Sequence, residues 1–237
     1  MCYHISMKAR LQKLAERYGR KTDIGEIIRE IIEQQYHTGA FSNPQYPIIT
    51  AEEEIQVFQW GLIPFWTRRD SDAQEVRRMT YNAKAETVFD KPSFREPILS
   101  KRCLVPSTGY FEYHHNEDGS TTPFYIYLLT EEIFSLAGIY DIWVNRQTGE
   151  IFQTFSVITT EANPFTAAIH NGGKNPRRMP VILSPEDEGK WLDPDLSKFA
   201  ISELLKPFDE KQMDAYPVRS DFIKKNPHDK TILEKAS

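Results

Sequence analysis

The chain has 237 residues, 40% of them hydrophobic and 12% aromatic, and carries a formal net charge of −5 at pH 7. This size and apolar content predict one domain with a substantial core, and no run of about 18 apolar residues is present to span a membrane. The acidic total argues against a protein that coats nucleic acid non-specifically, although it does not exclude a local basic patch. The two cysteines, Cys2 and Cys103, form no disulfide framework and no signal-peptide pattern precedes Cys2, so we expect a cytoplasmic protein.

The N-terminal fifth of the chain predicts two helices and a loop. Lys8 to Tyr18 has apolar residues at helical spacing, and Gly19 suits the position just past a helix end. Asp23 to Tyr36 repeats the pattern, although Gly25 and several β-branched isoleucines weaken it. Thr38 to Tyr46 contains glycine, asparagine and proline and is expected to be a loop.

From Pro47 onward, segments rich in β-branched and aromatic residues predict strands. Turn-forming residues at 116–119 and 145–149 indicate antiparallel hairpins between several of them. The expected strands are Pro47 to Thr50, Ile55 to Trp60, Arg102 to Pro106, Gly109 to His114, Phe124 to Leu129, Ile133 to Asp141, Glu150 to Thr159 and Met213 to Val218.

The C-terminal part of the chain adds two helices and a tail. A short helix is expected at Asn163 to Ile169, and Ser184 followed by proline and two acidic residues is typical of a helix start. The domain is expected to span residues 1–223. The polar tail, residues 224–237, is expected to attach loosely to it.

Cys2 becomes the N-terminus if the initiator methionine is removed, which its small side chain permits. A mature N-terminal cysteine carries a thiol and a free α-amine on adjacent carbons, with ordinary pKa values of about 8.5 and 7.7–8.0. Both nucleophiles are then partly available near neutral pH. The alternative is that Cys2 is only a small residue that opens a strand, just as Cys103 reads as a core residue.

The segment Trp60-Gly61-Leu62-Ile63-Pro64-Phe65-Trp66 places three large rings around a turn. Such a loop can belong to the core, or it can stack on nucleic-acid bases. Basic residues gather around it and in a later loop, either as phosphate contacts or as solvated, ion-paired faces. They are Arg68, Arg69, Arg77, Arg78, Lys84, Arg95, Lys101 and Arg102 near the aromatic segment, and Lys174, Arg177 and Arg178 after His170.

Three further residues are candidates for chemistry, each with a structural alternative. Asn82 reads first as the cap of a following helix. Glu112 lies among aromatic residues, where burial would raise its pKa toward neutrality, unless it occupies the wet face of a sheet. His170 enters a flexible loop suited to an acid or base, where lone histidines are more often exposed. No set of residues typical of a metal or cofactor site is present.

Taken together, five ordered motifs closely resemble the SRAP (SOS-response-associated peptidase) family of abasic-site processing proteins. They are Met1-Cys2, the segment from Trp60 to Trp66, Asn82-Ala83-Lys84, Gly109 to Tyr113, and Ile169-His170 followed by Arg178-Met179-Pro180. The resemblance runs from Cys2 to about Val218. It implies an α+β single domain built on a curved, mainly antiparallel β-sheet or open barrel with peripheral helices.

The resemblance also implies a function, which is covalent capture of abasic sites in single-stranded DNA through a thiazolidine formed by the α-amine and thiol of Cys2. His170 would assist opening of the sugar ring, Glu112 would orient the Cys2 amine and shuttle its proton, and Asn82 would hold Cys2 or the adduct. Phosphates would be held by Lys84, Arg95 and Arg178, and the lesion would be stacked by Pro64, Phe65 and Trp66. No cofactor or metal is expected, the protein is expected to be a monomer near the nucleoid, and the replication machinery is a candidate partner.

This sequence departs from the family pattern at three places. The family commonly begins Met-Cys-Gly-Arg, whereas Tyr3 and His4 follow Cys2 here. Lys84 stands where arginine is usual, which keeps the charge but loses the bidentate fork. Residues 171–176 look inserted between His170 and the Arg178-Met179-Pro180 element, and could widen the site.

Two other functions stay open on the residues alone. An N-terminal-cysteine peptidase or amidohydrolase would use Cys2 as nucleophile and its own amine as base. Self-processing at Met1-Cys2 would be an additional peptidase activity of the abasic-site processing protein. A non-covalent single-stranded DNA-binding module would leave Cys2 inert.

Overall fold

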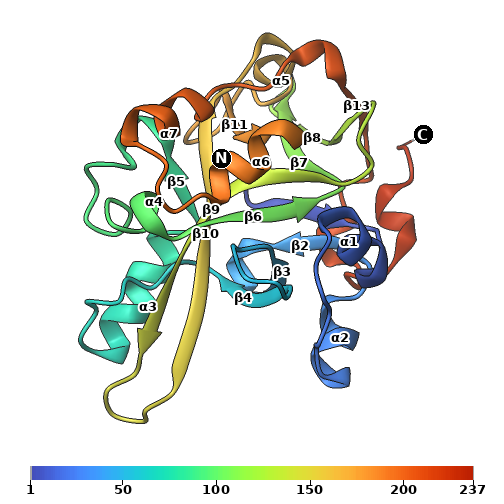
Figure 1. The fold of residues 1–237 in the computed structure, drawn as a ribbon. Helices are drawn as coiled ribbons and strands as arrows, with labels where there is room; N and C mark the ends of the chain where they lie inside the picture. The colour runs from blue at the N-terminus through green and yellow to red at the C-terminus, as the bar shows by residue number, and fades with distance from the viewer. Residues whose placement is uncertain (1, 237) are drawn as a thin grey trace.

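Two mainly antiparallel sheets with peripheral helices form the computed structural model, which describes residues 2–236 (Figure 1). The strands in this part of the chain are β1 (His4–Met7), β2 (Gln35–Gly39), β3 (Gln45–Ile48), β4 (Gln56–Trp60), β5 (Asn82–Lys84), β6 (Arg102–Ser107), β7 (Gly109–His115), β8 (Thr121–Leu128), β9 (Phe134–Val144), β10 (Ile151–Glu161), β11 (Arg178–Pro180), β12 (Ile182–Leu183) and β13 (Met213–Pro217). The α-helices are α1 (Leu11–Tyr18), α2 (Glu26–Ile32), α3 (Asp70–Met79), α4 (Pro97–Ser100), α5 (Pro164–Ile169), α6 (Pro185–Leu192) and α7 (Lys198–Leu204). Short 3-10 helices cover Ala40–Ser42, Ala85–Thr87, Glu210–Gln212, Phe222–Lys224 and Lys230–Leu233.

The first sheet has five antiparallel strands in the order β13-β8-β7-β1-β2. The second is built around the long β9–β10 hairpin, which stands out in Figure 1. Only the pairings of β10 with β4 and with β5 are parallel in the described sheets. The expected α+β fold on an open, mainly antiparallel sheet is therefore confirmed.

One apolar core extends across both sheets and contains the fully buried rings of Trp60, Tyr110, Phe155 and Trp191. Cys103 is also fully buried there, as expected. Each expected strand region from Pro47 to Val218 contains a strand, because alternation of large apolar residues matches the period of two along a half-buried strand. No helix of residues 2–236 is both long and apolar enough to cross a membrane.

Residues that the sequence predicts as helix ends occupy these positions at three helices. Gly19 ends α1 in the left-handed conformation with φ of 59°. Asn163 caps α5, since its side-chain oxygen accepts from the Thr166 backbone N–H at 2.8 Å. Ser184 and Pro185 begin α6 as predicted, although the Ser184 hydroxyl bonds the Asp187 carboxylate at 3.0 Å.

Residues 33–46 differ from the prediction. The expected helix over Asp23 to Tyr36 is too long, because α2 begins at Glu26 and ends at Ile32, and Gln34 then turns the chain with φ of 48°. Residues Gln35–Gly39 then form the edge strand β2 beside β1, so the expected loop from Thr38 is also shorter. Pairing with β1 overrides the helical pattern of the local sequence.

The C-terminal tail is packed, which differs from the expected loose attachment. Ile232 is 1% exposed and belongs to a small apolar cluster with Phe111 and Phe222. The Tyr36 backbone N–H donates to the Pro227 carbonyl at 2.8 Å, and Val218 pairs with Lys235 in an isolated bridge. The tail therefore covers the outer face of the five-stranded sheet near β2.

Candidate active site

Cys2 precedes β1 and is fully buried, with its thiol 3.9 Å from the His4 carbonyl oxygen. Strand β1 pairs with β7 through Ile5 and Tyr110, which brings the N-terminal end of the chain beside Glu112 on β7. Burial, and to a lesser degree the nearby Glu112 carboxylate, raises the pKa of the Cys2 thiol well above its ordinary range. The predicted removal of Met1 lies outside the described residues.

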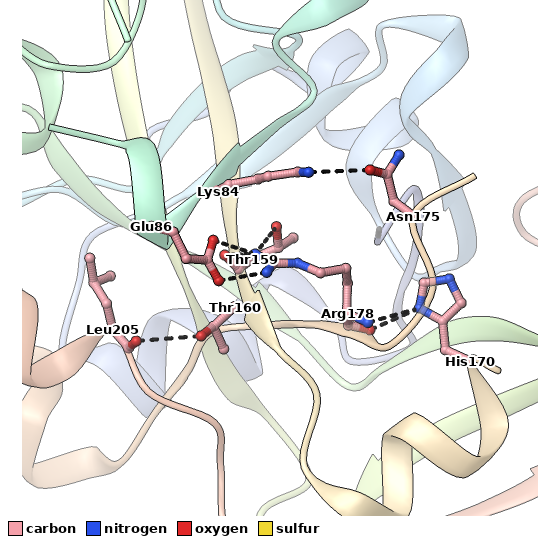
Figure 2. A network of polar contacts seen from close by, with 8 residues as sticks. All are labelled: Lys84, Glu86, Thr159, Thr160, His170, Asn175, Arg178 and Leu205. Atoms are coloured by element: carbon pink, nitrogen blue, oxygen red, sulfur yellow. Dashed lines mark hydrogen bonds and ion pairs between the residues drawn. The ribbon is translucent and has the colours of Figure 1, made fainter. Parts of the chain in front are cut away.

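Glu112 and His170 meet inside the protein. His170 Nε2 lies 3.6 Å from Glu112 Oε2, and the two residues are 7% and 4% exposed respectively. The alternatives of a wet-face glutamate and an exposed loop histidine are therefore wrong. On its other side, His170 Nδ1 lies 2.9 Å from the Arg178 carbonyl oxygen and 3.3 Å from the Arg178 backbone nitrogen, which fixes the ring (Figure 2).

Burial moves the pKa values of this pair in opposite directions. The pKa of Glu112 is raised to about 8 because its charged form is desolvated. Burial likewise lowers the pKa of His170 to about 4. Near neutral pH the imidazole is uncharged and the carboxyl group is close to its own pKa. Glu112 can therefore gain or lose a proton at neutral pH.

The two residues line a pocket of about 450 Å³, which we call the acid–base pocket. Tyr3, which precedes β1, and His4, which begins it, contribute to the wall, and residues 172–175 close another side. Burial also lowers the pKa of His4 to about 4, and its Nδ1 lies 2.9 Å from Nε2 of His37. His4 is therefore a neutral residue at physiological pH.

Asn82 begins strand β5 and caps no helix, which corrects the first interpretation of this residue. It is 7% exposed, and neither its Nδ2 nor its Oδ1 has a hydrogen-bond partner among residues 2–236. It lines a second pocket of about 490 Å³, which we call the tryptophan pocket, together with Trp66, Met79, Lys84 and Phe94. The structure thus places Asn82 in the wall of a different pocket from Glu112 and His170.

The aromatic segment is divided between core and surface. Trp60 is fully buried and its ring N–H donates to the Tyr81 carbonyl at 2.8 Å, and Pro64 is buried as well. Phe65 and Trp66 are 48% and 42% exposed. The core interpretation therefore holds for Trp60 and Pro64, whereas the rings of Phe65 and Trp66 are exposed and stay candidates for base stacking.

Backbone contacts hold the exposed rings in place. The Phe65 N–H donates to Oδ2 of the buried Asp141 at 2.8 Å, and Asp141 Oδ1 pairs with Lys101 Nζ at 2.6 Å. Lys101 Nζ in turn lies 5.4 Å from the centroid of the Phe65 ring. Gly61 has φ of 105°, and a Cβ there would lie 2.7 Å from the Arg77 side chain, so only glycine fits this turn.

The three predicted phosphate contacts occupy different environments. Arg178 is 9% exposed, forms a two-pronged ion pair with Glu86 at 2.6 and 3.0 Å, and donates to the Thr159 carbonyl (Figure 2). Lys84 Nζ donates to Asn175 Oδ1 at 3.2 Å, and Figure 2 shows it pointing across to the loop that carries Asn175. Arg95 is exposed and lines neither pocket.

Arg77 and Arg102 of the first basic group are structural. Arg77 is 5% exposed and donates to Gln59, and Arg102 is 4% exposed and donates to several backbone carbonyls, including that of Trp191 at 2.8 Å. Phe41, which no predicted motif includes, is 62% exposed, and its ring centroid lies 4.8 Å from that of Tyr3. Its only sequence signal is an aromatic residue within a loop that contains glycine and proline.

No group of three or more histidine, cysteine, aspartate or glutamate side chains in the described part of the chain is placed to hold a metal ion.

The fold and the site define a single-domain protein with a buried cysteine near its N-terminus and an acid–base pair beside it. Residues 1–225 match the family model described as SOS response associated peptidase (SRAP), and the chain belongs to this family.

Several known proteins are similar to the chain. The abasic site processing protein YoqW of Bacillus subtilis (strain 168) is 34% identical over 194 residues, which cover 79% of this chain and 82% of YoqW. The abasic site processing protein HMCES of Gallus gallus is 30% identical over 164 residues, covering 61% of this chain and 46% of HMCES. A crystal structure of a protein from Bacteroides thetaiotaomicron has 56% identity and a TM-score of 0.96, with full coverage of both chains. A Bordetella bronchiseptica structure with 22% identity, a TM-score of 0.77 and coverage of 92% of this chain and all of that one shares the fold.

Proposed function

We propose that this protein processes abasic sites by capturing them covalently in single-stranded DNA through Cys2. The observation that carries the proposal is the buried Glu112–His170 pair, 3.6 Å apart, beside the strand that begins two residues after Cys2. Relatives named as abasic site processing proteins support the choice of substrate. Removal of Met1 is a condition of the proposal, because only then does Cys2 carry a free α-amine.

The chemistry begins at the ring-opened form of the abasic deoxyribose, which carries an aldehyde at C1′. The Cys2 amine adds to C1′ and water leaves, which gives an imine. The Cys2 thiol then adds across the C=N bond, so that sulfur bonds to C1′ and the thiol proton ends on the nitrogen. The product is a five-membered thiazolidine, and each protein molecule is consumed by one lesion.

The acid–base pair suits these proton transfers. A carboxyl group with a pKa of about 8 can take a proton from the attacking amine and return one to the leaving water at neutral pH. A neutral imidazole at His170 can assist opening of the sugar ring by proton transfer. Asn82, whose amide has no partner among residues 2–236, would hold Cys2 or the adduct from the neighbouring pocket.

The DNA strand would follow the exposed aromatic residues. Phe65 and Trp66 would stack on bases next to the lesion, over the turn that contains Pro64. Lys84 and Arg95 would contact phosphates. Arg178 would do so only by sharing its guanidinium between a phosphate and Glu86, with which it is paired here.

A peptidase mechanism is less well supported. An N-terminal cysteine peptidase needs the thiol to attack as a nucleophile, and burial next to Glu112 opposes formation of the thiolate. In the proposed capture the amine attacks first, so a high thiol pKa is no obstacle to the first step.

The test is incubation of the mature protein, with Met1 removal verified by mass spectrometry, with a single-stranded oligonucleotide that carries one abasic site. We expect an adduct that survives denaturing electrophoresis with the wild type and with Cys103→Ala, and none with Cys2→Ala. Absence of an adduct with the wild type would refute the proposal. Turnover of a peptide without DNA would favour the peptidase, and binding that ignores both the lesion and Cys2→Ala would favour a non-covalent module.

A further inference from the structure

The segment 171–175 crosses the acid–base pocket as a strap that is anchored at both ends. At one end, Asn171 pairs with the backbone of His115 at the end of β7: His115 N–H donates to Asn171 Oδ1 at 2.8 Å, and Asn171 Nδ2 donates to the His115 carbonyl at 3.0 Å. At the other end, Asn175 accepts from Lys84 on β5. The strap therefore connects the two sheets across the pocket, and Figure 2 shows its Asn175 end.

The strap has a defined path. Gly172 lies directly on the His115 ring, where a Cβ would come within 2.5 Å of His115 Cγ. Gly173 follows with φ of 86°, a conformation that favours glycine. The Arg177 backbone N–H donates to the His170 carbonyl at 2.8 Å, which closes the base of the loop. These contacts fix where the side chain of Lys174 begins.

Lys174 is exposed, and it is the one lysine or arginine among the described residues that line the acid–base pocket. A phosphate that enters this pocket meets the Glu112 carboxyl group, and two basic groups nearby, those of Arg178 and His4, are paired or uncharged. Arg178 is paired with Glu86. His4 is neutral at physiological pH and bonded to His37.

We propose that Lys174, positioned by the 171–175 strap, is the residue that binds the DNA phosphate at the mouth of the acid–base pocket. The inference rests on the proposed function, because single-stranded DNA is its ligand. An ammonium group suits this position since it attracts a phosphate as a point charge without requiring a fixed angle. Asn171 is then a positioning residue, because it acts through the strap and not on the DNA.

The test measures equilibrium binding to a single-stranded oligonucleotide that carries one tetrahydrofuran, a stable abasic analogue that cannot form an aldehyde. Fluorescence anisotropy at several salt concentrations gives the dissociation constant and the slope of its logarithm against that of salt. Lys174→Ala should weaken binding about fivefold near 0.1 M salt and reduce the slope by about 0.7, the value for one single-strand phosphate contact. Lys174→Arg should restore both quantities.

Arg146→Ala is the matched control, since it removes one exposed positive charge from the β9–β10 turn, which Figure 1 places at the far end of the molecule from α5. It should change binding less than twofold. Asn171→Ala keeps Lys174 but frees the strap, and should reproduce part of the loss in slope. Equal slopes for Lys174→Ala, Arg146→Ala and wild type would overturn the assignment of Lys174. A wild-type slope for Asn171→Ala would overturn positioning by the strap.

This experiment separates the two proposals, because the analogue reports binding without capture. A reduced salt slope in Lys174→Ala, together with no covalent adduct between the wild type and natural abasic DNA, would support the Lys174 contact and refute the capture. A wild-type adduct together with an unchanged salt slope in Lys174→Ala would support the capture and refute the Lys174 contact.

Discussion

The acid–base pocket and the tryptophan pocket adjoin at the hydrogen bond between Lys84 and Asn175, but they contain different kinds of groups. The first contains two buried titratable side chains, Glu112 and His170. Burial raises the pKa of Glu112 and lowers the pKa of His170. The second combines apolar side chains with the neutral amide of Asn82 and with two lysines at its wall, Lys84 and Lys91. Under the proposed function, proton transfer belongs to the first pocket, and stacking on DNA bases belongs to Trp66 at the second.

The largest effect is expected from Glu112→Gln, which keeps the shape of the side chain but removes its proton exchange. We expect the rate of adduct formation at pH 7 to fall about 10²–10⁴-fold, the usual contribution of a positioned acid or base. The measurement is single-turnover capture of an abasic oligonucleotide at saturating protein. Glu117→Gln, at an exposed glutamate in the β7–β8 turn, is the control and should capture at the wild-type rate. A wild-type rate of adduct formation for Glu112→Gln would show that proton exchange by Glu112 does not contribute to capture.

Trp60 and Trp66 belong to one aromatic segment, but we expect the first to serve stability and the second to serve DNA binding. Trp60→Ala should lower the free energy of unfolding by about 3–5 kcal/mol, because this ring is fully buried in the core. Trp66→Ala should change stability by less than about 1 kcal/mol, since its ring is 42% exposed. It should instead weaken single-stranded DNA binding by about 1–3 kcal/mol through lost stacking. Urea unfolding and anisotropy check the two predictions, and the opposite pattern would mean that Trp66 serves the fold.

These two tryptophans also show what the sequence can and cannot predict. Apolar alternation and turn residues predict the strands of four or more residues from β3 onward, because that signal is local, but they do not predict the shorter strands β5, β11 and β12. The same local signal does not say which ring of Trp60 to Trp66 is buried, since this depends on Asp141 and Thr154, whose side chains bond the Phe65 and Ile63 backbones at 2.8 Å. Residues 33–39 were mispredicted for a related reason, because pairing with β1 decides their conformation.

The candidate site follows the same rule. Residue type and the family resemblance predict Glu112 and His170 as site residues. In the structure, His170 Nε2 lies 3.6 Å from Glu112 Oε2. Neither residue type nor the resemblance reveals that Glu86 pairs with Arg178 from 92 positions away, or that Asn82 is on a strand. A single sequence has no signal for an ion pair of that separation, since any of its many acidic residues could be the partner.

The pH dependence of stability gives a smaller effect that also distinguishes the pockets. The pKa of Glu112 is about 8 in the folded protein and about 4.3 in the unfolded chain, so the folded state holds one more proton between these values. The free energy of unfolding of the wild type, relative to Glu112→Gln, should therefore fall as pH rises from about 5 to 8. The slope should reach up to about 1.4 kcal/mol per pH unit.

Chemical denaturation of both proteins across this range measures the difference. His4 and His37, whose pKa values are lowered to about 4, give stability that is lost as pH falls from about 6.5 toward 4. This contribution is common to both proteins and cancels when they are compared. Parallel stability curves for the two proteins would show that Glu112 ionises in the folded state as easily as in the unfolded chain.

The smallest effect on stability is expected from Asn82→Leu in the tryptophan pocket. Both amide atoms of Asn82 are buried without a hydrogen-bond partner among residues 2–236, so an apolar side chain of similar shape loses no bond within this part of the protein. Stability should stay unchanged or rise by about 1 kcal/mol, while capture of abasic DNA slows roughly tenfold. Thermal unfolding and single-turnover capture measure the two quantities. A loss of more than about 2 kcal/mol would assign the amide to the fold, whereas the expected pair of results would mean that this strand keeps a costly polar group for a ligand.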